Sequence, residues 1–534
     1  MRGPQYFKSW INDWNWGVRI ALFLILMSSL VQFGVFAMTQ NYLISLLGFQ
    51  SEDLSFGMQI CYVGILGILP IQFRFLRYFE TRNYLIVNIT AGILLSLACL
   101  FIRDVNVFFV VRFLQGIVVC NIAGCMVVLI YSRLKTEHMQ AIGSSVFYGS
   151  IFSNGVIIGI AAAMVVNSSD WTQVYVYSII FQLATLVIVL LALKSTSGHK
   201  KYPLYQIDWI GFVLLIAAAG SLTYTMVYGS KYYWFEDRRI VISSLAAASG
   251  TVCFLFRQYL IRRPLIDLSI FKSRNFVIGL VILAIYYGFK DSINLIYSYT
   301  GGVLGWSPYR LMILGLCNVS GIILFMIFSG QLIIRNRHST KGFLIAGFSI
   351  MIIYHLWMYF VFTPDLSFPD LIIPVFLQGA SAGLIFVPVV IFILSSAPKH
   401  TGTTGIFVAA CTRFNATLQS IAGFYNLQLF FNKNYKTGIL NRVSFLDFAT
   451  SERLNSYVQM FSSKGYTTEQ ATSLAYSSLG RAVDLQAQIL GYRAIFLTIA
   501  IVLSIVLFLI AVTPSLNKTV LHYSKRMFIW VFHK

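Results

Sequence analysis

The chain has 534 residues, of which 58% are hydrophobic and only 11% are charged. A soluble domain carries roughly 25% charged residues, so this composition excludes an ordinary soluble fold. The net charge of +21 would suit nucleic-acid binding, but most Lys and Arg fall in short links between apolar stretches. Membrane proteins keep their cytoplasmic positive charge in such links, so we expect a bilayer environment and no nucleic-acid partner.

Apolar stretches of about 20 residues recur along the chain, and each is long enough to cross a bilayer. Backbone polar groups in lipid must bond within their own segment, so each stretch is expected to be a helix. We predict an all-α polytopic membrane protein with about 14 spans, at residues 17–39, 54–73, 83–102, 105–131, 140–165, 171–193, 207–228, 239–260, 275–298, 309–331, 342–362, 370–396, 402–430 and 491–513.

The links between these spans alternate in charge. Basic residues occupy every second link, at Arg74, Arg77, Arg82, Arg133, Lys135, Lys194, Lys200, Lys201, Arg262, Arg263, Lys272, Arg274, Arg335, Arg337 and Lys341. The other links carry acids, at Glu52, Asp53, Asp104, Asp170, Glu236, Asp237, Asp365 and Asp370. Because Lys and Arg beside a span stay on the cytoplasmic side, both termini are expected to be cytoplasmic.

The spans group into segments along the chain. We expect an interfacial N-terminus at 1–16, a six-helix half at 17–193, two inserted helices at 207–260, a second six-helix half at 275–513, and a basic tail at 514–534. Inside the second half, residues 431–490 are polar enough to leave the membrane. Thr467 to Gln470 matches a capping box that starts a helix through about Ile489, and an earlier helix is expected from about Ser451 to Gly465. This external helical hairpin either caps the bundle or offers a docking surface.

The tetrapeptide FLQG occurs twice, at 113–116 and 376–379. Each copy lies early in a span that enters from outside, and that span is the fourth of its six-helix set. The basic link that follows the second span of each set also repeats. Two related halves are how many transporters place a site at mid-membrane, so the pattern favours a transporter.

Few charges fall deep inside the spans, where each costs at least about 2.5–3.5 kcal/mol. Arg112 lies in the fourth span with Gln115 three residues along on the same helical face. The guanidinium either ties helix carbonyls together or serves a proton relay or substrate contact.

Lys290, Asp291 and Arg413 are the other deep charges of the second half. Adjacent helical residues point about 100° apart, so Lys290 and Asp291 are not expected to pair face to face. Asp291 either forms an ion pair with another span or faces a wet cavity and exchanges protons. Arg413 is then a candidate counter-charge for it.

Several polar and aromatic residues are candidates to line a substrate cavity, although polar side chains in spans also serve as contacts between helices. They are Tyr286, Tyr287, Asn294, Asn318, His355, Gln378, Asn415 and Gln419. His355 suits a hydrogen-bonded packing role better than a metal site, because it lacks companion ligands. We expect no cofactor, no metal and no enzymatic activity.

Several segments in chain order resemble the major facilitator superfamily, in particular its fourteen-helix drug:proton antiporters of the EmrB/QacA type. They are Arg112–Gly116 (R-x-x-Q-G), Ile207–Gly211 (D-W-x-G), Arg263–Phe276 (P-L-x-D-L…N-F), Leu304–Pro308 and Gln378–Pro388. The resemblance implies two six-helix halves plus two central helices, and export of amphipathic small molecules by alternating access in a bacterial inner membrane. The long final loop is similar to that of members that work with a periplasmic adaptor and an outer-membrane channel.

The chain departs from this family at three positions. The first helix usually carries an acid, but Leu30 to Phe33 has none; the link after the second helix lacks its usual Asp; and Ser153 to Gly155 lacks a Pro. Arg112 carries over and the usual first-helix acid does not. We therefore expect Asp291 to be the substitute protonation site and Arg112 to tune it. The rival interpretation is a membrane sensor or assembly scaffold that kept the fold and no longer transports.

Overall fold

The computed structural model describes residues 6–134, 139–168, 170–195, 204–336, 340–398, 401, 404–443 and 447–517. These residues form helices joined by short links, with one isolated bridge between Phe7 and Leu193. The α-helices are α1 (Ser9–Asn12), α2 (Asn15–Leu47), α3 (Ser51–Tyr78), α4 (Thr81–Phe101), α5 (Val105–Arg133), α6 (Met139–Ser168), α7 (Thr172–Ala192), α8 (Trp209–Tyr228), α9 (Arg238–Leu260), α10 (Arg274–Lys290), α11 (Ile293–Gly302), α12 (Pro308–Asn336), α13 (Thr340–Val361), α14 (Phe368–Ser396), α15 (Thr404–Leu440), α16 (Phe448–Ser462) and α17 (Thr468–Val512). Short 3-10 turns lie at Leu204–Gln206, Trp234–Glu236, Leu268–Lys272 and Pro514–Asn517. Some of the basic residues on which the predicted orientation depends lie outside the described residues. They are Lys135, Lys200, Lys201, Arg337 and the tail from 518 onward.

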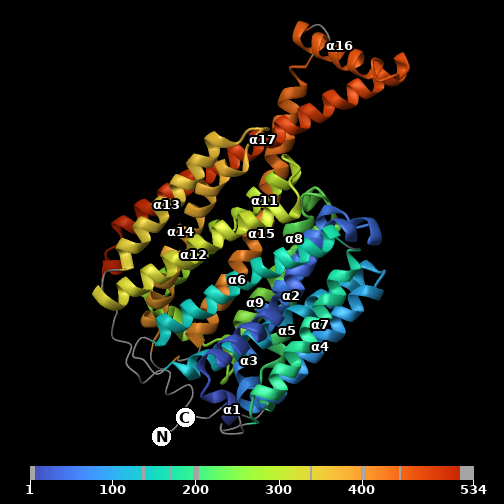
Figure 1. Ribbon diagram of the computed structural model, residues 1–534. Helices are drawn as coiled ribbons and strands as arrows, with labels where there is room; N and C mark the ends of the chain where they lie inside the picture. The colour runs from blue at the N-terminus through green and yellow to red at the C-terminus, as the bar shows by residue number, and fades with distance from the viewer. Residues whose placement is uncertain are drawn as a thin grey trace.

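The helices form one elongated bundle (Figure 1). Within the described residues, thirteen helical segments are long and apolar enough to cross a membrane, with α10 and α11 together making one of them. The helix α15 occupies the remaining predicted span, and it carries polar residues such as Arg413 and Asn415 and is not among these thirteen segments. The predicted all-α membrane fold with about 14 spans is confirmed.

The two ends of the bundle differ. The helix α16 and the first part of α17 project from one end, the α16 end, whereas α1 and the close of α17 lie at the opposite end, the α1 end (Figure 1). Alternation of the helices places the acidic links, such as Glu52 and Asp53, at the α16 end. The described basic residues Arg74, Arg133 and Arg257 lie at the α1 end.

The two FLQG copies make the same close helix contact. A Cβ on Gly116 of α5 would lie 2.0 Å from the backbone oxygen of Cys61 on α3. A Cβ on Gly379 of α14 would likewise lie 2.0 Å from the backbone oxygen of Asn318 on α12. Small residues let helix backbones approach closely in membranes, so each glycine fixes one helix pair. The sequence repeat is therefore a repeat of packing.

The inserted helices α8 and α9 pack on each other, and α8 also packs on α3. At the α1 end, Asp208 caps α8 by accepting from the Gly211 backbone N–H at 2.9 Å, and it pairs with Arg257 Nε of α9 at 2.8 Å. Gln258 donates to Asp208 at 3.0 Å and accepts from the Leu265 N–H at 2.6 Å. Burial alone would raise the pKa of Asp208, but these hydrogen bonds and the Arg257 charge outweigh burial and hold the pKa below its ordinary value. This acid therefore joins both inserted helices to the link that leads into α10.

The projecting hairpin was predicted correctly at its turn and incorrectly at its end. Thr467 and Gln470 form the capping box, and Gly465 before it has φ +90°. We predicted that the second hairpin helix stops near Ile489, but α17 continues without a break to Val512. Gly491 does not end the helix, because it lies against α15, where a Cβ would meet Asn432 Oδ1 at 2.4 Å. Close packing thus explains this glycine better than termination does.

Candidate functional site

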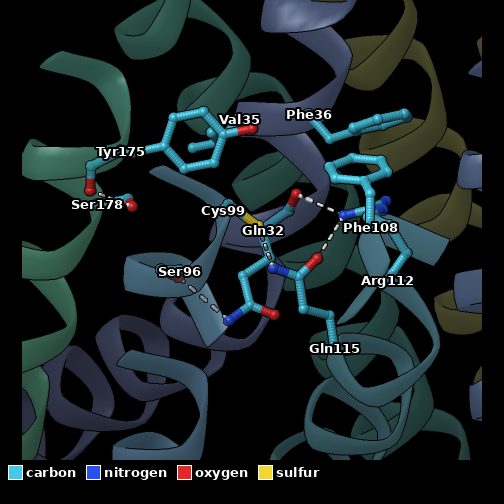
Figure 2. Close-up of a pocket in the computed structure, with 10 residues that line it drawn as sticks. All are labelled: Gln32, Val35, Phe36, Ser96, Cys99, Phe108, Arg112, Gln115, Tyr175 and Ser178. Carbon is cyan, nitrogen blue, oxygen red and sulfur yellow. Dashed lines mark hydrogen bonds between the residues drawn. The ribbon is translucent and has the colours of Figure 1, made fainter. Parts of the chain in front are cut away.

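Arg112 lies at the centre of the first half, between α2, α3 and α5, and is 1% exposed. Its Nη1 donates to Gln115 Oε1 at 2.7 Å and to the Gln32 backbone oxygen at 3.3 Å, and its Nε donates to the Gly57 backbone oxygen at 3.2 Å. Figure 2 shows the bonds to Gln32 and Gln115. The guanidinium also lies 4.1 Å from the Phe36 ring centroid. Arg112 therefore joins three helices through their carbonyl groups, which is the structural role given as one of its two interpretations above.

The charge of Arg112 has no carboxylate partner among the described residues. Its Nη2 makes no hydrogen bond, and the Oε1 atom of nearby Gln32 also makes none. These groups border a cavity of about 10 Å³, which is the size of one water molecule. Gln32 belongs to the Leu30–Phe33 stretch in which the first-helix acid is missing. Gln32 contacts Arg112 through its backbone oxygen, while its side-chain Nε2 donates to the Gly92 oxygen of α4 at 2.9 Å, so this stretch supplies no carboxylate to neutralise the cation.

Lys290 and Asp291 form an ion pair in the second half, and our expectation that they cannot pair is wrong. Lys290 Nζ lies 3.0 Å from Asp291 Oδ1, with 14% and 11% of the two side chains exposed. The expectation assumed an unbroken helix, but α10 ends at Lys290 and α11 begins at Ile293. Asp291 caps α10 with ψ 1°, outside the helical range, so the chain leaves the regular helical rotation at this residue. The break brings the two charges together.

The same break frees backbone carbonyls, and side chains from three helices bond to them or to the turn. Gln378 of α14 donates to the Lys290 oxygen at 2.7 Å, and Ser420 of α15 donates to the Gly288 oxygen at 2.6 Å. His355 of α13 contacts Ser292 Oγ at 3.0 Å and the Met351 oxygen at 2.7 Å. Broken helices at membrane depth need such partners for their open backbone groups. His355 therefore has a structural contact at each ring nitrogen.

Arg413 of α15 lies against aromatic rings from both halves. Its guanidinium carbon is 4.7 Å from the Tyr148 ring centroid of α6 and 5.0 Å from the Tyr287 centroid of α10. Lys290 Nζ is 5.3 Å from the Phe152 centroid of α6, so both cations face α6. Asp291 pairs with Lys290 rather than with Arg413, which no described carboxylate contacts. We call Tyr148, Phe152, Tyr287, Lys290, Asp291 and Arg413 the interface cluster.

The remaining candidates are distributed unevenly. Asn318 donates to Gln378 and to the Val375 oxygen, and Tyr286 donates to the Ala382 oxygen at 3.1 Å, so all three side chains join the packing of the second half. Asn294 and Asn415 are exposed and Gln419 is partly buried. Within the described residues, no group of three or more His, Cys, Asp or Glu side chains could hold a metal ion.

Sequence reasoning missed Tyr148, Phe152 and Ser420. Aromatic residues make up 16% of the chain, so no pattern separates these two rings from the others. Ser420 could be found only by knowing that α10 breaks beside it. Gln32 did carry a signal, because it occupies the stretch where an acid was expected.

The Major Facilitator Superfamily profile matches residues 20–417 of the chain. The chain is 26% identical over 345 residues to the multidrug export protein EmrB of Escherichia coli, which covers 61% of this chain and 62% of that protein. It is 21% identical over 469 residues to the colistin resistance protein EmrB of Acinetobacter baumannii, covering 83% and 85%. The first of these alignments thus spans less than two thirds of the relative.

Solved structures share the fold at low identity. A POT family transporter in complex with a thioalcohol-conjugated peptide superposes with a TM-score of 0.61 at 13% identity, covering 94% of this chain and 97% of that one. A peptide transporter POT mutant in complex with sulfate gives a TM-score of 0.58 at 14% identity, covering 94% and 95%. The family match over most of the chain, together with this fold, shows that the protein is a multi-pass membrane protein of the major facilitator superfamily.

Proposed function

We propose that the protein is a secondary exporter of amphipathic small molecules, driven by a proton gradient and working by alternating access. The interface cluster carries the proposal. It places two cations, one carboxylate and three aromatic rings between α6 of the first half and α10 and α15 of the second. A site shared by two halves changes its access when the halves rock against each other. The proposed activity is transport, and no enzymatic reaction is part of it.

Polar contacts at the α16 end support alternating access. Tyr425 of α15 donates to Glu52 of α3 at 3.0 Å, and Asn426 donates to the Met226 oxygen of α8 at 2.8 Å. These bonds close the second half against the first half and the inserted pair. Each such bond contributes only about 1 kcal/mol, so a small difference in substrate affinity between two states could open them. We propose that this end faces outward.

Asp291 is the proposed proton carrier. Its Oδ1 pairs with Lys290 while its buried Oδ2 makes no hydrogen bond. Protonation would release Lys290 and change the charge of the interface cluster, which couples proton binding to substrate binding. Arg112 would adjust this coupling from the first half, where its charge is not neutralised. Gln115 holds the Arg112 guanidinium in place.

Gln32 favours the rival function, a sensor or assembly scaffold without transport, because an amide cannot exchange protons as a carboxylate does. Flux measurements separate the two functions. The full chain in liposomes with an imposed proton gradient should accumulate a fluorescent amphipathic compound, and dissipating the gradient should stop it. Asp291→Asn is the matched variant. Flux that equals empty liposomes for a broad set of compounds would support the scaffold.

We further propose a bacterial inner-membrane location with both termini cytoplasmic, and a periplasmic adaptor with an outer-membrane channel as partners. The hairpin supports this, since α16 and the start of α17 extend beyond the bundle (Figure 1). Its exposed Phe448, Met460 and Tyr476 could receive a partner helix. Replacing residues 445–485 by a flexible linker should spare flux in vesicles and lower export by whole cells. Cysteines placed at Ser462 and Ser524 should label from outside and from inside, respectively; the reverse labelling would contradict the orientation.

A further inference from the structure

We infer that the interface cluster selects organic anions: compounds with an apolar or aromatic body and one carboxylate, sulfonate or phenolate group. The inference rests on the proposed function, in which the interface cluster binds the substrate, and it adds that the substrate carries a negative charge. Arg413 carries it, because its guanidinium lies at the boundary between the halves with no described carboxylate in contact.

Arg413 is surrounded by aromatic rings and is hydrogen-bonded to Tyr148, and no described carboxylate pairs with it. The Tyr148 and Tyr287 rings lie 4.7 and 5.0 Å from the guanidinium carbon and the Phe414 ring lies 5.0 Å away. Aromatic faces attract a cation, but they leave its planar N–H donors without a charged acceptor. A carboxylate or sulfonate matches that donor fork and an aromatic substrate body matches the rings. The site thus offers both parts of an anionic amphiphile a partner.

Tyr287 supplies a second donor. Its ring is 2% exposed and its hydroxyl makes no hydrogen bond, although it lies beside Arg413. A buried hydroxyl without a partner is rare, because burial costs it its bonds to water. An anion held by Arg413 would give this O–H an acceptor. A cationic substrate would offer none.

The charge of the wider interior has the same sign. Of the described residues set deep in the spans, Arg112, Lys290 and Arg413 are cations and Asp291 alone is an acid, already paired with Lys290. Charges act over long distances in a medium of low polarity, so an entering anion is attracted and an entering cation is repelled. Among these described deep charges, Asp291 is the one that would oppose an anion.

Tetraphenylborate and tetraphenylphosphonium test the inference, because these ions have nearly the same shape and opposite charge. Binding is measured to the full chain in nanodiscs, with empty nanodiscs subtracted. The borate should bind saturably and at least about 10-fold more tightly than the phosphonium. Tetraphenylborate has no hydrogen-bond acceptor, so the comparison measures the effect of charge alone. Arg413→Gln should reduce that preference by roughly 10- to 100-fold, the range expected for losing one positive charge near a bound anion.

Two further variants keep the test decisive if Arg413→Gln fails to fold. Asp291→Asn retains all three cations and should increase the preference for the borate. Arg481→Gln removes an exposed arginine of the projecting hairpin and should change nothing. Equal binding of both ions, a preference for the phosphonium, or a preference that Asp291→Asn lowers would overturn the inference. Selective flux of cations would refute the inference and leave the exporter standing, whereas anion binding without any flux would refute the exporter and leave the inference standing.

Discussion

The two halves of the bundle share their packing and differ in their charges. At both Gly116 and Gly379 an added Cβ would lie 2.0 Å from a backbone oxygen of the neighbouring helix. Gln378 bonds directly to the first helix of its half, whereas Gln115 accepts from Arg112, which in turn bonds to that of the other half. The first half then buries a lone cation, Arg112, whereas the second half holds an ion pair and a stacked arginine. The two halves therefore repeat the same close helix packing, while their buried charges differ and give each half a different chemistry.

Gly116→Val and Gly379→Val test the shared packing and should have the largest effects. Each added side chain would collide with a backbone oxygen that cannot move without shifting a helix. We expect each variant to lose about 3 kcal/mol of stability or more, with little folded protein recovered. Thermal melting and the yield of monodisperse protein measure this.

Gly220→Val and Gly423→Val are the matched controls, since a Cβ at either position meets nothing within 4 Å. They should fold with near-normal yield. If one repeat glycine tolerated valine and the other did not, the equivalence of the two helix pairs would be refuted.

Arg112→Ala should abolish transport and leave the protein in the membrane. The substitution removes donors to Gln115, the Gln32 oxygen and the Gly57 oxygen. Losing charged hydrogen bonds of this kind lowers an equilibrium by tenfold or more, so flux should fall below about a tenth of the wild-type rate. Flux in liposomes, compared at equal reconstituted protein, is the measurement.

Gln32→Glu complements that test by giving the first half an acid like that of the second. The new carboxylate would gain the attraction of the unbonded Arg112 Nη2 but would lose the donation from Gln32 Nε2 to the Gly92 oxygen at 2.9 Å, so this variant should lose less stability than one that adds a cation. Gln32→Lys would place a second cation there and should lose about 3 kcal/mol or more. Near-normal flux in Arg112→Ala would show that Arg112 has only a structural role. Equal destabilisation by the two Gln32 variants would show that the charge of Arg112 is already neutralised.

Asp291→Asn should remove the pH dependence of transport while substrate binding stays measurable. The amide cannot exchange a proton, but it still fits the turn between α10 and α11. Flux measured from pH 5.5 to 8.5 should become flat, with the loss at the wild-type optimum reaching about tenfold. The substitution leaves Lys290 without its ion-pair partner, so the melting temperature of the protein should also fall.

The double variant Lys290→Met, Asp291→Asn separates these effects. It removes both charges and should recover stability relative to Asp291→Asn alone, because no unpaired ion remains. A pH profile that Asp291→Asn leaves unchanged would place proton coupling at another acid or remove it from the mechanism.

The positions of the helices could be predicted from the sequence, because apolar length reports directly on the bilayer. The α4, α5 and α9 boundaries lie within two residues of the predicted spans. The contacts of the charged residues could not be predicted in the same way. Lys290 and Asp291 pair only because α10 breaks. Gly288, two residues before the break, is a weak signal for it, because glycines also occur inside the unbroken helices of this chain. Arg413 meets Tyr148 only when two halves far apart in sequence come together, which hydropathy does not encode.

Asp208 gives the smallest expected effect. It caps α8 and precedes the apolar segment Trp209–Tyr228, although the predicted span began at residue 207, so it provides an acid outside the membrane for comparison. It accepts from Gly211, Arg257 and Gln258, and these bonds hold its pKa below the ordinary value of about 3.9. A lowered pKa in the folded state contributes stability above the ordinary pKa, and that stability is lost only as pH falls through the lower folded value. Asp208→Asn should therefore lower stability by roughly 2 kcal/mol, equally at pH 8 and pH 5. Glu236→Gln, at an exposed acid of the opposite end, should change the free energy of unfolding by less than about 0.5 kcal/mol.

The outcome that would contradict this is a difference in unfolding free energy between wild type and Asp208→Asn that widens or narrows from pH 8 to pH 5. It would mean that Asp208 titrates in that range and that Arg257 of α9 does not control its charge. A constant gap would show that an acid outside the bilayer gives steady support, in contrast to Asp291, whose exchange of a proton is the proposed source of pH dependence.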